Sequence, residues 1–356
     1  MIVSKLTPRR DATGVAPLVA YLGWHGQGNL GDDAIYDAVR LQLPDANFVD
    51  LPRFPHEVIR ATATGLTRSL RHGVQVMGGG TLVGTRYFRR LVKRGLALTR
   101  NNGSYAIGVG VEDPDFARRK YGSDRDEMKR WAPLLSEFRT VSVRGPRSAE
   151  LLSEVGLNVQ VSGDPALLLP RPDVTPEDGL IGVNLGFGDD DLWGQDPAMV
   201  AQEMARALTQ LSSQGHRFVG ILMNRADMRW TQLALNGINA DIVSPVDAHG
   251  AARELARCSV AIVSRLHAGI LAATSGTPVV SLEYLPKCRD FALSIGDERS
   301  LIRTDKLSHT AVVDHVDSTL ADATIIRART EAAVAELRRR LQAEYAAIRN
   351  QLGAKC

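Results

Sequence analysis

The sequence is poor in aromatic residues, carries little net charge and lacks a long apolar run. Aromatic residues make up 5% of the 356 residues, and the formal net charge is +3 at pH 7. A nucleic-acid-binding module needs a broad basic and aromatic surface, so this composition argues against one. No stretch approaches the roughly 20 apolar residues that a membrane-spanning helix requires. We therefore expect a folded protein that does not cross a bilayer.

Cysteine is also scarce. Cys258, Cys288 and Cys356 are too few and too scattered for a disulfide framework or a zinc site. No other metal-binding spacing is present, because His25, Asp32 and Asp33 lack a partner at a recognised interval. The sequence thus predicts a cytoplasmic protein without a metal.

The chain is long enough for two domains, and its pattern supports two. Short β-rich apolar runs alternate with segments of helical spacing, a pattern typical of βα units around a parallel sheet. The alternation breaks at 171–179, a segment rich in proline and acidic residues, and restarts afterwards. We predict an N-terminal Rossmann-like domain at 1–170, this linker, and a second Rossmann-like domain at 180–322.

The C-terminal segment 323–356 carries apolar residues three or four positions apart, which predicts one face of a long helix. Its apolar residues include Val334, Leu337, Leu341 and Tyr345. We expect this helix to pack across both domains. The predicted fold is α/β, with two doubly wound domains facing a cleft in the GT-B-like arrangement. Ligands of open α/β sheets bind beyond the carboxyl ends of the strands, so the loops after each strand hold the candidate site.

The loop after the first predicted strand is rich in glycine and leads directly into a helix. Gly26, Gly28 and Gly31 allow close backbone approach to a ligand, and a helix N-terminus favours an anion. Asn29 and Asp32 are able to cap the helix or to hydrogen-bond a ligand. The spacing is not the dinucleotide fingerprint. A tight turn with a good N-cap explains the same residues without any ligand.

Two further strand ends carry candidate residues. The run Gly78-Gly79-Gly80 follows the apolar strand at 74–77 and leaves room for a ligand, although turn geometry alone would also need it. Arg144 directly follows the strand at 140–143. A guanidinium there is placed to bind a carboxylate or phosphate with two hydrogen bonds, and pairing with a helix acid is the structural alternative.

The segment Arg265-Leu266-His267 carries the strongest local signal. A buried strand ends at Val263 and a helix begins near Leu266, so Arg265 and His267 stand where backbone N–H groups and a cation both favour an anion. A bound anion would favour the imidazolium form of His267, which would then act as a general acid. A capping or core histidine is the alternative.

A basic cluster occupies one predicted helix. Its members are Arg86, Arg89, Arg90, Lys93 and Arg94. Such a helix suits a peripheral contact with anionic lipid at the inner face of the membrane or with a diphosphate-lipid acceptor. A solvated basic face is the structural alternative.

These motifs together resemble the polysaccharide pyruvyl transferase family. The matching residues, in order along the chain, are Gly26-x-x-Asn29-x-Gly31-Asp32, Gly78-Gly79-Gly80, Val143-Arg144, Ser264-Arg265-Leu266-His267, Gly276-Thr277-Pro278, Tyr284 and Lys287. They span both predicted domains. Each motif alone is weak, but their order and number make the resemblance specific.

The resemblance implies an enzyme that transfers the pyruvate unit of phosphoenolpyruvate to a saccharide of a cell-surface polysaccharide or glycolipid, forming a ketal. It implies that phosphoenolpyruvate is a co-substrate and that no cofactor is needed. Arg144, Arg265, Leu266, His267 and Lys287 match the donor-binding positions, and His267 matches the acid. Asp32 is a candidate base. Two alternatives remain: a glycosyltransferase of the same fold with a nucleotide-sugar donor, and a noncatalytic anion-binding module.

Overall fold

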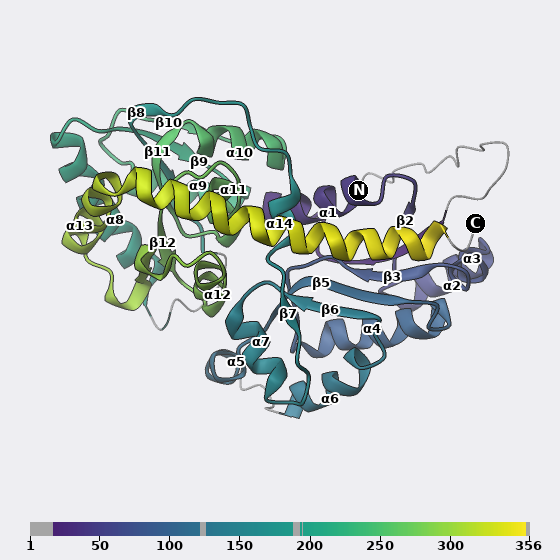
Figure 1. The fold of residues 1–356 in the computed structure, drawn as a ribbon. Coiled ribbons are helices and arrows are strands. Elements are labelled where there is room, and N and C mark those ends of the chain that lie inside the picture. Colours follow the sequence, from purple (N-terminus) through teal and green to yellow (C-terminus); the bar gives the residue numbers. More distant parts are fainter. Residues whose placement is uncertain (1–16, 122–125, 188–192, 194, 354–356) are drawn as a thin grey trace.

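The computed structural model describes residues 17–121, 126–187, 193 and 195–353 and folds them into two α/β lobes (Figure 1). Each lobe is built on one parallel sheet. Most strands are buried on both faces, as the eight residues of β5 illustrate, and this explains their continuous apolar runs. The predicted fold class is confirmed.

The first lobe contains a sheet in the order β2-β1-β3-β5-β6-β7, with β4 beside β5. All of these pairs are parallel. The strands are β1 (Leu18–Leu22), β2 (Asn47–Asp50), β3 (Val74–Met77), β4 (Thr81–Val83), β5 (Ser104–Val111), β6 (Thr140–Val143) and β7 (Gln160–Val161). The helices are α1 (Leu30–Gln42), α2 (Pro55–Ala63), α3 (Leu66–Leu70), α4 (Arg86–Thr99), α5 (Pro114–Tyr121), α6 (Asp126–Leu135), α7 (Pro146–Ser153) and the 3₁₀ turn η1 (Pro165–Leu168).

The second lobe repeats this plan with a sheet in the order β10-β9-β8-β11-β12-β13, again all parallel. Its strands are β8 (Glu177–Asn184), β9 (Arg217–Ile221), β10 (Asp241–Val243), β11 (Cys258–Val263), β12 (Val279–Glu283) and β13 (Leu301–Arg303). Its helices are α8 (Pro197–Ser213), α9 (Met228–Ala234), α10 (Ala248–Ala256), α11 (Leu266–Thr274), α12 (Pro286–Ser294) and α13 (His309–Ala321), with 3₁₀ turns η2 (Arg225–Asp227), η3 (Glu298–Ser300) and η4 (Thr304–Lys306).

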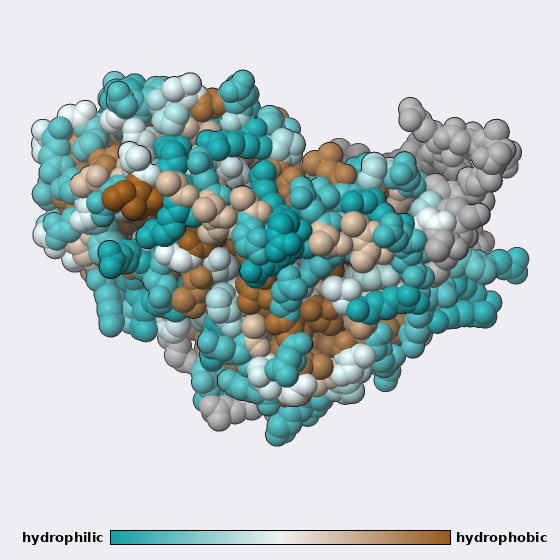
Figure 2. All heavy atoms as spheres, in the orientation of Figure 1, coloured by the Kyte–Doolittle hydropathy of each residue, from teal (hydrophilic) through white to brown (hydrophobic). Residues whose placement is uncertain are grey.

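The last helix, α14 (Ala323–Gly353), runs across both lobes (Figure 1). Its apolar stripe is buried, as the spacing predicted. In the second lobe Arg327 donates to the Ser275 carbonyl, and in the first lobe Arg349 donates to the Gln42 carbonyl. In the same orientation, hydrophobic residues gather below α14 over β5, β6 and β7 (Figure 2). The helix therefore ties the two lobes together along one side.

The observed elements differ from the predicted ones mainly at their ends. β8 begins at Glu177, so the chain enters the second sheet before the predicted linker 171–179 ends. The strands β4, β7 and β13 were not predicted, because two or three residues leave no readable alternation.

Among the described residues, none of the helices combines the length and apolar character that a membrane span needs.

Candidate active site between the lobes

The glycine-rich loop after β1 contacts the second lobe directly. The N–H of Leu30 donates to the Met223 carbonyl at 3.0 Å, and the Asn224 side chain donates to the Gly28 carbonyl at 2.9 Å. Gly26 and Gly28 have φ of 73° and 75°, the left-handed region that glycine adopts without strain. The loop thus forms part of the interface between the lobes.

The N–H groups at the start of α1 are not open to an anion as the sequence suggested. The N–H of Gly26 donates to Asp33 at 2.6 Å, and the N–H of Gly31 donates to the side chain of Asn29, the N-cap, at 3.1 Å. Leu30 is engaged by the other lobe. These N–H groups are therefore used within a turn and by the N-cap of α1, the explanation that requires no ligand.

Gly31 makes room for His267. A Cβ atom added at residue 31 would lie 2.3 Å from Nδ1 of the His267 ring, so only glycine permits this approach. His267 lies in the first turn of α11, whose N-cap is Arg265. The end of the second sheet thus brings an imidazole against the backbone of the first lobe.

Asp164 joins His267 to Arg144. One oxygen of Asp164, Oδ2, lies 3.6 Å from Nε2 of His267 and 3.8 Å from Nη1 of Arg144. His267 belongs to the second lobe, whereas Arg144 follows β6 and Asp164 precedes η1 in the first. The structure therefore brings together two of the predicted site residues from opposite lobes.

These three side chains keep unused hydrogen-bonding atoms. Nε of Arg144, Oδ2 of Asp164 and Nε2 of His267 are buried and have no hydrogen-bond partner within ordinary distance. Buried polar atoms are usually paired, and a group of unpaired ones often marks a functional site. Two of the three residues offer N–H donors when charged, which suits a ligand with several acceptor oxygens.

Asp164 is charged despite its burial. Burial raises its pKa, but the contact with His267, the charge of Arg144 and the N–H of Ala166 lower it by more, so the pKa lies below the ordinary value. The carboxylate therefore stabilises positive charge on its neighbours.

Asp32 lies beside this cluster. Burial raises its pKa, and the charges of His267 and Lys287 oppose that effect without cancelling it. Oδ2 of Asp32 accepts a hydrogen bond from the Asn29 side chain at 2.6 Å. A carboxylate with a raised pKa is a better base. The position of Asp32 beside His267 and its raised pKa therefore both suit the role of a general base.

The glycines after β3 shape the same region. Gly79 and Gly80 have φ of 85° and 78°. A Cβ at residue 79 would lie 2.9 Å from Pro165, next to Asp164, and a Cβ at residue 80 would lie 3.9 Å from Asp32. These glycines pack against site residues rather than lining an open ligand cavity.

Arg144 is held by both lobes. Its Nη2 donates to Thr81 at 3.3 Å, and its Nε lies 3.8 Å from Oδ2 of Asp290 on α12. Asp290 also accepts hydrogen bonds from the Ser148 N–H and hydroxyl at 3.1 and 2.7 Å. The side chain of Arg144 is 1% exposed. A buried guanidinium with only long contacts to carboxylates is poorly satisfied without a ligand.

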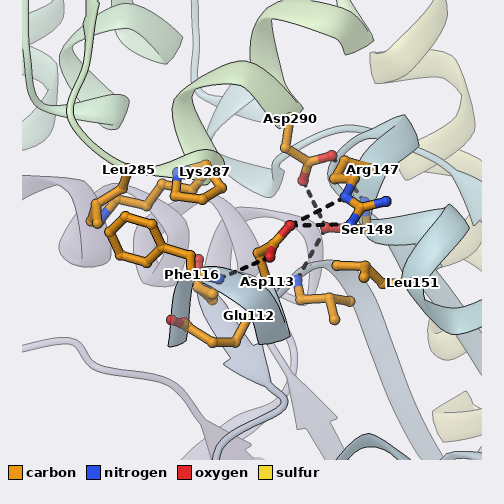
Figure 3. A pocket seen from close by; sticks show the side chains of 12 residues that line it. Glu112, Asp113, Phe116, Arg147, Ser148, Leu151, Leu285, Lys287 and Asp290 are labelled. Carbon is orange, nitrogen blue, oxygen red and sulfur yellow. Dashed lines mark hydrogen bonds and ion pairs between the residues drawn. The ribbon is translucent and has the colours of Figure 1, made fainter. Parts of the chain in front are cut away.

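A cavity of about 240 Å³ lies at this boundary, and Thr81 and Asp290, which contact Arg144, are among its lining residues (Figure 3). Lys287 and Leu285 border it from the second lobe, facing Asp113 and Arg147 of the first. Nζ of Lys287 lies 5.1 Å from the centre of the Tyr284 ring. Arg147 also lines the cavity, where it pairs with Asp113 and Glu150 at 3.2 Å each. Lys287 thus faces a space next to the cluster.

Arg265 has a different environment. Its Nε and Nη2 both donate to Oδ1 of the fully buried Asp227, at 3.0 and 2.7 Å, and its N–H donates to Asn184. Leu266 is buried in the core of the second lobe. Arg265 is therefore held by a buried acid, whereas His267 and Arg144 meet at Asp164, and Asp32 is influenced by the charges of His267 and Lys287.

Three aspartates that contact these cations, Asp164, Asp227 and Asp290, were not predicted from the sequence. Asp164 follows the two-residue strand β7 in the run Ser162-Gly163-Asp164-Pro165, whose turn residues were the only signal. Asp227 and Asp290 lie in η2 and in the middle of α12, where no local pattern marks them. Their partners come from other segments of the chain.

Neither metal chemistry nor thiol chemistry is evident in the described part of the chain. It holds no group of three or more histidine, cysteine or acidic residues able to bind a metal ion. Burial raises the pKa of Cys258 to about 12 and that of Cys288 to about 11, so neither thiol is a nucleophile at neutral pH.

Comparison with known proteins gives a family match and several structural neighbours. The family model described as polysaccharide pyruvyl transferase matches residues 29–286. No curated protein sequence matches. A crystal structure of a putative UDP-N-acetylglucosamine 2-epimerase from Listeria monocytogenes is 12% identical, covers 95% of this chain and 97% of its own, and has a TM-score of 0.60.

Two other solved structures are similar in the same way. The UDP-GlcNAc 2-epimerase from Neisseria meningitidis bound to UDP-GlcNAc is 11% identical over 93% of this chain and 99% of its own, with a TM-score of 0.58. CalG4, the calicheamicin glycosyltransferase, is 13% identical over 95% and 98%, with a TM-score of 0.50. At this identity the neighbours show the fold alone, which is GT-B-like as predicted.

Proposed function

The chain belongs to the polysaccharide pyruvyl transferase family, and from this premise we propose that it transfers the pyruvate unit of phosphoenolpyruvate to a saccharide acceptor. The product is a pyruvate ketal on a cell-surface polysaccharide or glycolipid precursor, and inorganic phosphate is released. One observation carries the proposal: Arg144 and His267, from opposite lobes, meet at Asp164 with donor atoms that lack acceptors.

The donor would be held by its negative charges. Its carboxylate and phosphate oxygens are suitable acceptors for the guanidinium of Arg144, with Lys287 across the boundary as a further cation. Arg265 and Leu266 are assigned to donor binding because they match the family motif. Asp227 orients the Arg265 guanidinium. Holding the donor from both lobes makes its reaction with an acceptor effectively unimolecular.

The chemistry begins with a proton transfer. His267 as imidazolium gives its proton to the methylene carbon of the enol, which becomes a methyl group, and positive charge develops at the carbon that carries the phosphate. A sugar hydroxyl attacks that carbon while Asp32 accepts the hydroxyl proton. The bond to phosphate then breaks with its electron pair, and a second hydroxyl closes the ketal. One of the two hydroxyl protons restores His267, and the other leaves with phosphate.

The test measures phosphate release and product mass after incubation with phosphoenolpyruvate and a panel of lipid-linked and aryl glycosides. We expect phosphate release that depends on an acceptor, and a product heavier by a pyruvate ketal. His267→Ala is expected to lose turnover while donor binding stays measurable by titration. Turnover in His267→Ala equal to that of the wild type would remove His267 from the chemistry.

The same assay separates the alternatives. A glycosyltransferase would release a nucleotide from a nucleotide-sugar donor, and the GT-B-like fold is compatible with that reaction. A noncatalytic anion-binding module would bind phosphoenolpyruvate without any product. The family match favours the pyruvyl transfer over both.

We further propose that the protein is cytoplasmic and contacts the inner face of the membrane through α4. Arg86, Arg90 and Lys93 are exposed along one side of this helix, whereas Arg89 pairs with Glu127. Exposed cations of this kind bind anionic lipid in a salt-dependent way. Sedimentation with phosphatidylglycerol vesicles tests this, and equal binding by the R86A/R90A/K93A variant would contradict it.

A further inference from the structure

A second cavity, of about 590 Å³, lies in the first lobe at the carboxyl ends of β1 and β2. Its walls come from the loop after β1, the segment that leads into α2, and the start of α4. We propose that this cavity binds the acceptor as an anionic saccharide, with a sugar ring on Trp24 and a phosphate attached to the sugar against Arg53 and Arg60. This inference rests on the proposed transferase function and names the substrate class of its second substrate.

The cavity has an exposed aromatic wall in a chain that has few aromatic residues. Trp24, Phe54 and Tyr87 are 43%, 52% and 40% exposed. The ring centres of Trp24 and Tyr87 are 6.0 Å apart, with an angle of 78° between the ring planes. The ring centre of Phe88 lies 5.9 Å from that of Trp24. Large amphipathic rings bind partners that are apolar on one face and polar at the edge, as sugar rings are.

The backbone that carries Arg53 and Phe54 is firmly held. The carboxylate of Glu57 accepts hydrogen bonds from the N–H groups of both residues, at 2.6 and 3.1 Å. Arg94 of α4 donates to the Arg53 carbonyl at 3.1 Å and also to the Pro52 carbonyl. A wall fixed by so many hydrogen bonds presents its side chains with little loss of entropy on binding.

The cavity wall carries two arginines and two carboxylates, and neither arginine forms an ion pair with a described residue. Glu57 accepts hydrogen bonds from backbone N–H groups, and Asp50, which is 57% exposed, lies 3.3 Å from His25, whose pKa is lowered by burial. Arg53 lies over the Trp24 ring at 5.6 Å and donates to the Gly23 carbonyl at 3.2 Å, and it has no carboxylate partner among the described residues. Arg60 forms no ion pair there either. Because neither guanidinium is held by a carboxylate, both are able to bind the phosphate of a phosphorylated sugar beside the aromatic wall.

The position of the cavity suits an acceptor. In the sheet order β2-β1-β3-β5, the cavity lies at the ends of β2 and β1, and Arg144 follows β6 on the other side of β3. Neighbouring strands are about 5 Å apart, and β6 is three strands from β1 and four from β2, so the cavity and Arg144 are separated by roughly 15 to 20 Å. The β1–α1 loop connects the cavity to His267, because it begins beside Trp24 and leads to Gly31, which contacts His267.

Titration calorimetry with a panel of hexose 1-phosphates and the corresponding free hexoses tests the inference. We expect binding of at least one hexose 1-phosphate and weaker binding of its free hexose. Trp24→Ala and Arg60→Ala should each weaken the phosphate's binding about tenfold, equivalent to ~1.4 kcal/mol. Ile59→Ala and Arg68→Ala are matched controls, because both residues are exposed on α2 or α3 and lie outside the cavity wall. They should bind as the wild type does.

Phosphoenolpyruvate binding is measured in parallel and should be the same in all four variants. If the wild type does not bind phosphoenolpyruvate but binds a hexose 1-phosphate in a way that depends on Trp24, the result counts against the proposed function and not against the saccharide site. Wild-type sugar binding in Trp24→Ala and Arg60→Ala, or no binding of any hexose 1-phosphate, would overturn the acceptor site. Binding to sugar-free phosphatidylglycerol vesicles that requires Trp24 and Ile59 alike, with no sugar binding, would also overturn it and assign the surface to the membrane.

Discussion

Gly31 and His267 come from different lobes and lie in direct contact. The His267 ring occupies the space that a side chain at position 31 would fill. The contact is 2.3 Å from the ideal Cβ position to Nδ1. Neither side can adjust cheaply, because Gly31 belongs to α1 and His267 to α11.

Gly31→Ala is therefore expected to displace the imidazole and to reduce turnover on the order of 10²-fold, the effect typical of a misplacement of about 1 Å. Steady-state turnover, compared with thermal unfolding of the same variant, measures it. Gly353→Ala near the end of α14 is the control, since its added Cβ would meet no atom within 4 Å. Wild-type turnover in Gly31→Ala would show that the two lobes are not in contact during catalysis.

Asp164 is a positioning residue for both His267 and Arg144. Asp164→Asn keeps the shape and the cap to the Ala166 N–H but removes the negative charge between two cations. The guanidinium of Arg144 is then held less firmly, so we expect the affinity for phosphoenolpyruvate to weaken about tenfold, or ~1.4 kcal/mol. Titration with phosphoenolpyruvate measures this affinity, and wild-type affinity in Asp164→Asn would exclude the positioning role.

Arg265 donates two hydrogen bonds to Asp227, and this fork fixes its guanidinium. Arg265→Lys replaces the fork by a point charge, so we expect donor binding to weaken by about tenfold, or ~1.4 kcal/mol. Titration with phosphoenolpyruvate measures it. Arg253→Lys, at an arginine in the last turn of α10, controls for the loss of any guanidinium. Equal donor affinity in Arg265→Lys would exclude Arg265 from the donor site.

Glu344 of α14 predicts a pH-dependent stability. It accepts hydrogen bonds from the hydroxyls of Ser142 and Ser162 at 2.8 and 2.7 Å, and burial raises its pKa above the ordinary value. Because the folded protein favours the protonated form, this contribution to stability is present below the ordinary pKa and is lost as the pH rises through the folded pKa.

Glu344→Gln keeps an acceptor and adds a donor for the two hydroxyls. We expect it to raise the thermal unfolding temperature at pH 8 relative to the wild type, with little difference at pH 4. Glu336→Gln is the control on the same helix, because Glu336 is half exposed and pairs with Arg339 and Arg340. A stabilisation that is the same at both pH values would contradict the assignment to ionisation of Glu344.

The sequence was sufficient for the fold because its signals are local. Apolar runs such as 104–111 and the helical stripe of 323–353 are read directly from spacing, and both are present as predicted. The short strand β7 could not be read, since two residues carry no periodicity.

The site was predictable only in part. Arg144 and His267 were visible because each follows a strand of a parallel sheet, and strand ends meet at one edge. Asp164, which joins them, has partners in β6 and in the other lobe, and such long-range contacts leave no local trace. At the start of α1 both kinds of contact occur: the N–H groups of Gly26 and Gly31 donate to the nearby Asp33 and Asn29, whereas that of Leu30 donates to the Met223 carbonyl of the second lobe.

The 31 residues of α14 limit how substrates reach the buried cluster. At 1.5 Å per residue this helix is about 46 Å long, and it is anchored in both lobes. A rigid rod fastened at both ends prevents the two halves from drifting apart along its length. Any widening of the boundary between the lobes is therefore confined to the side away from α14.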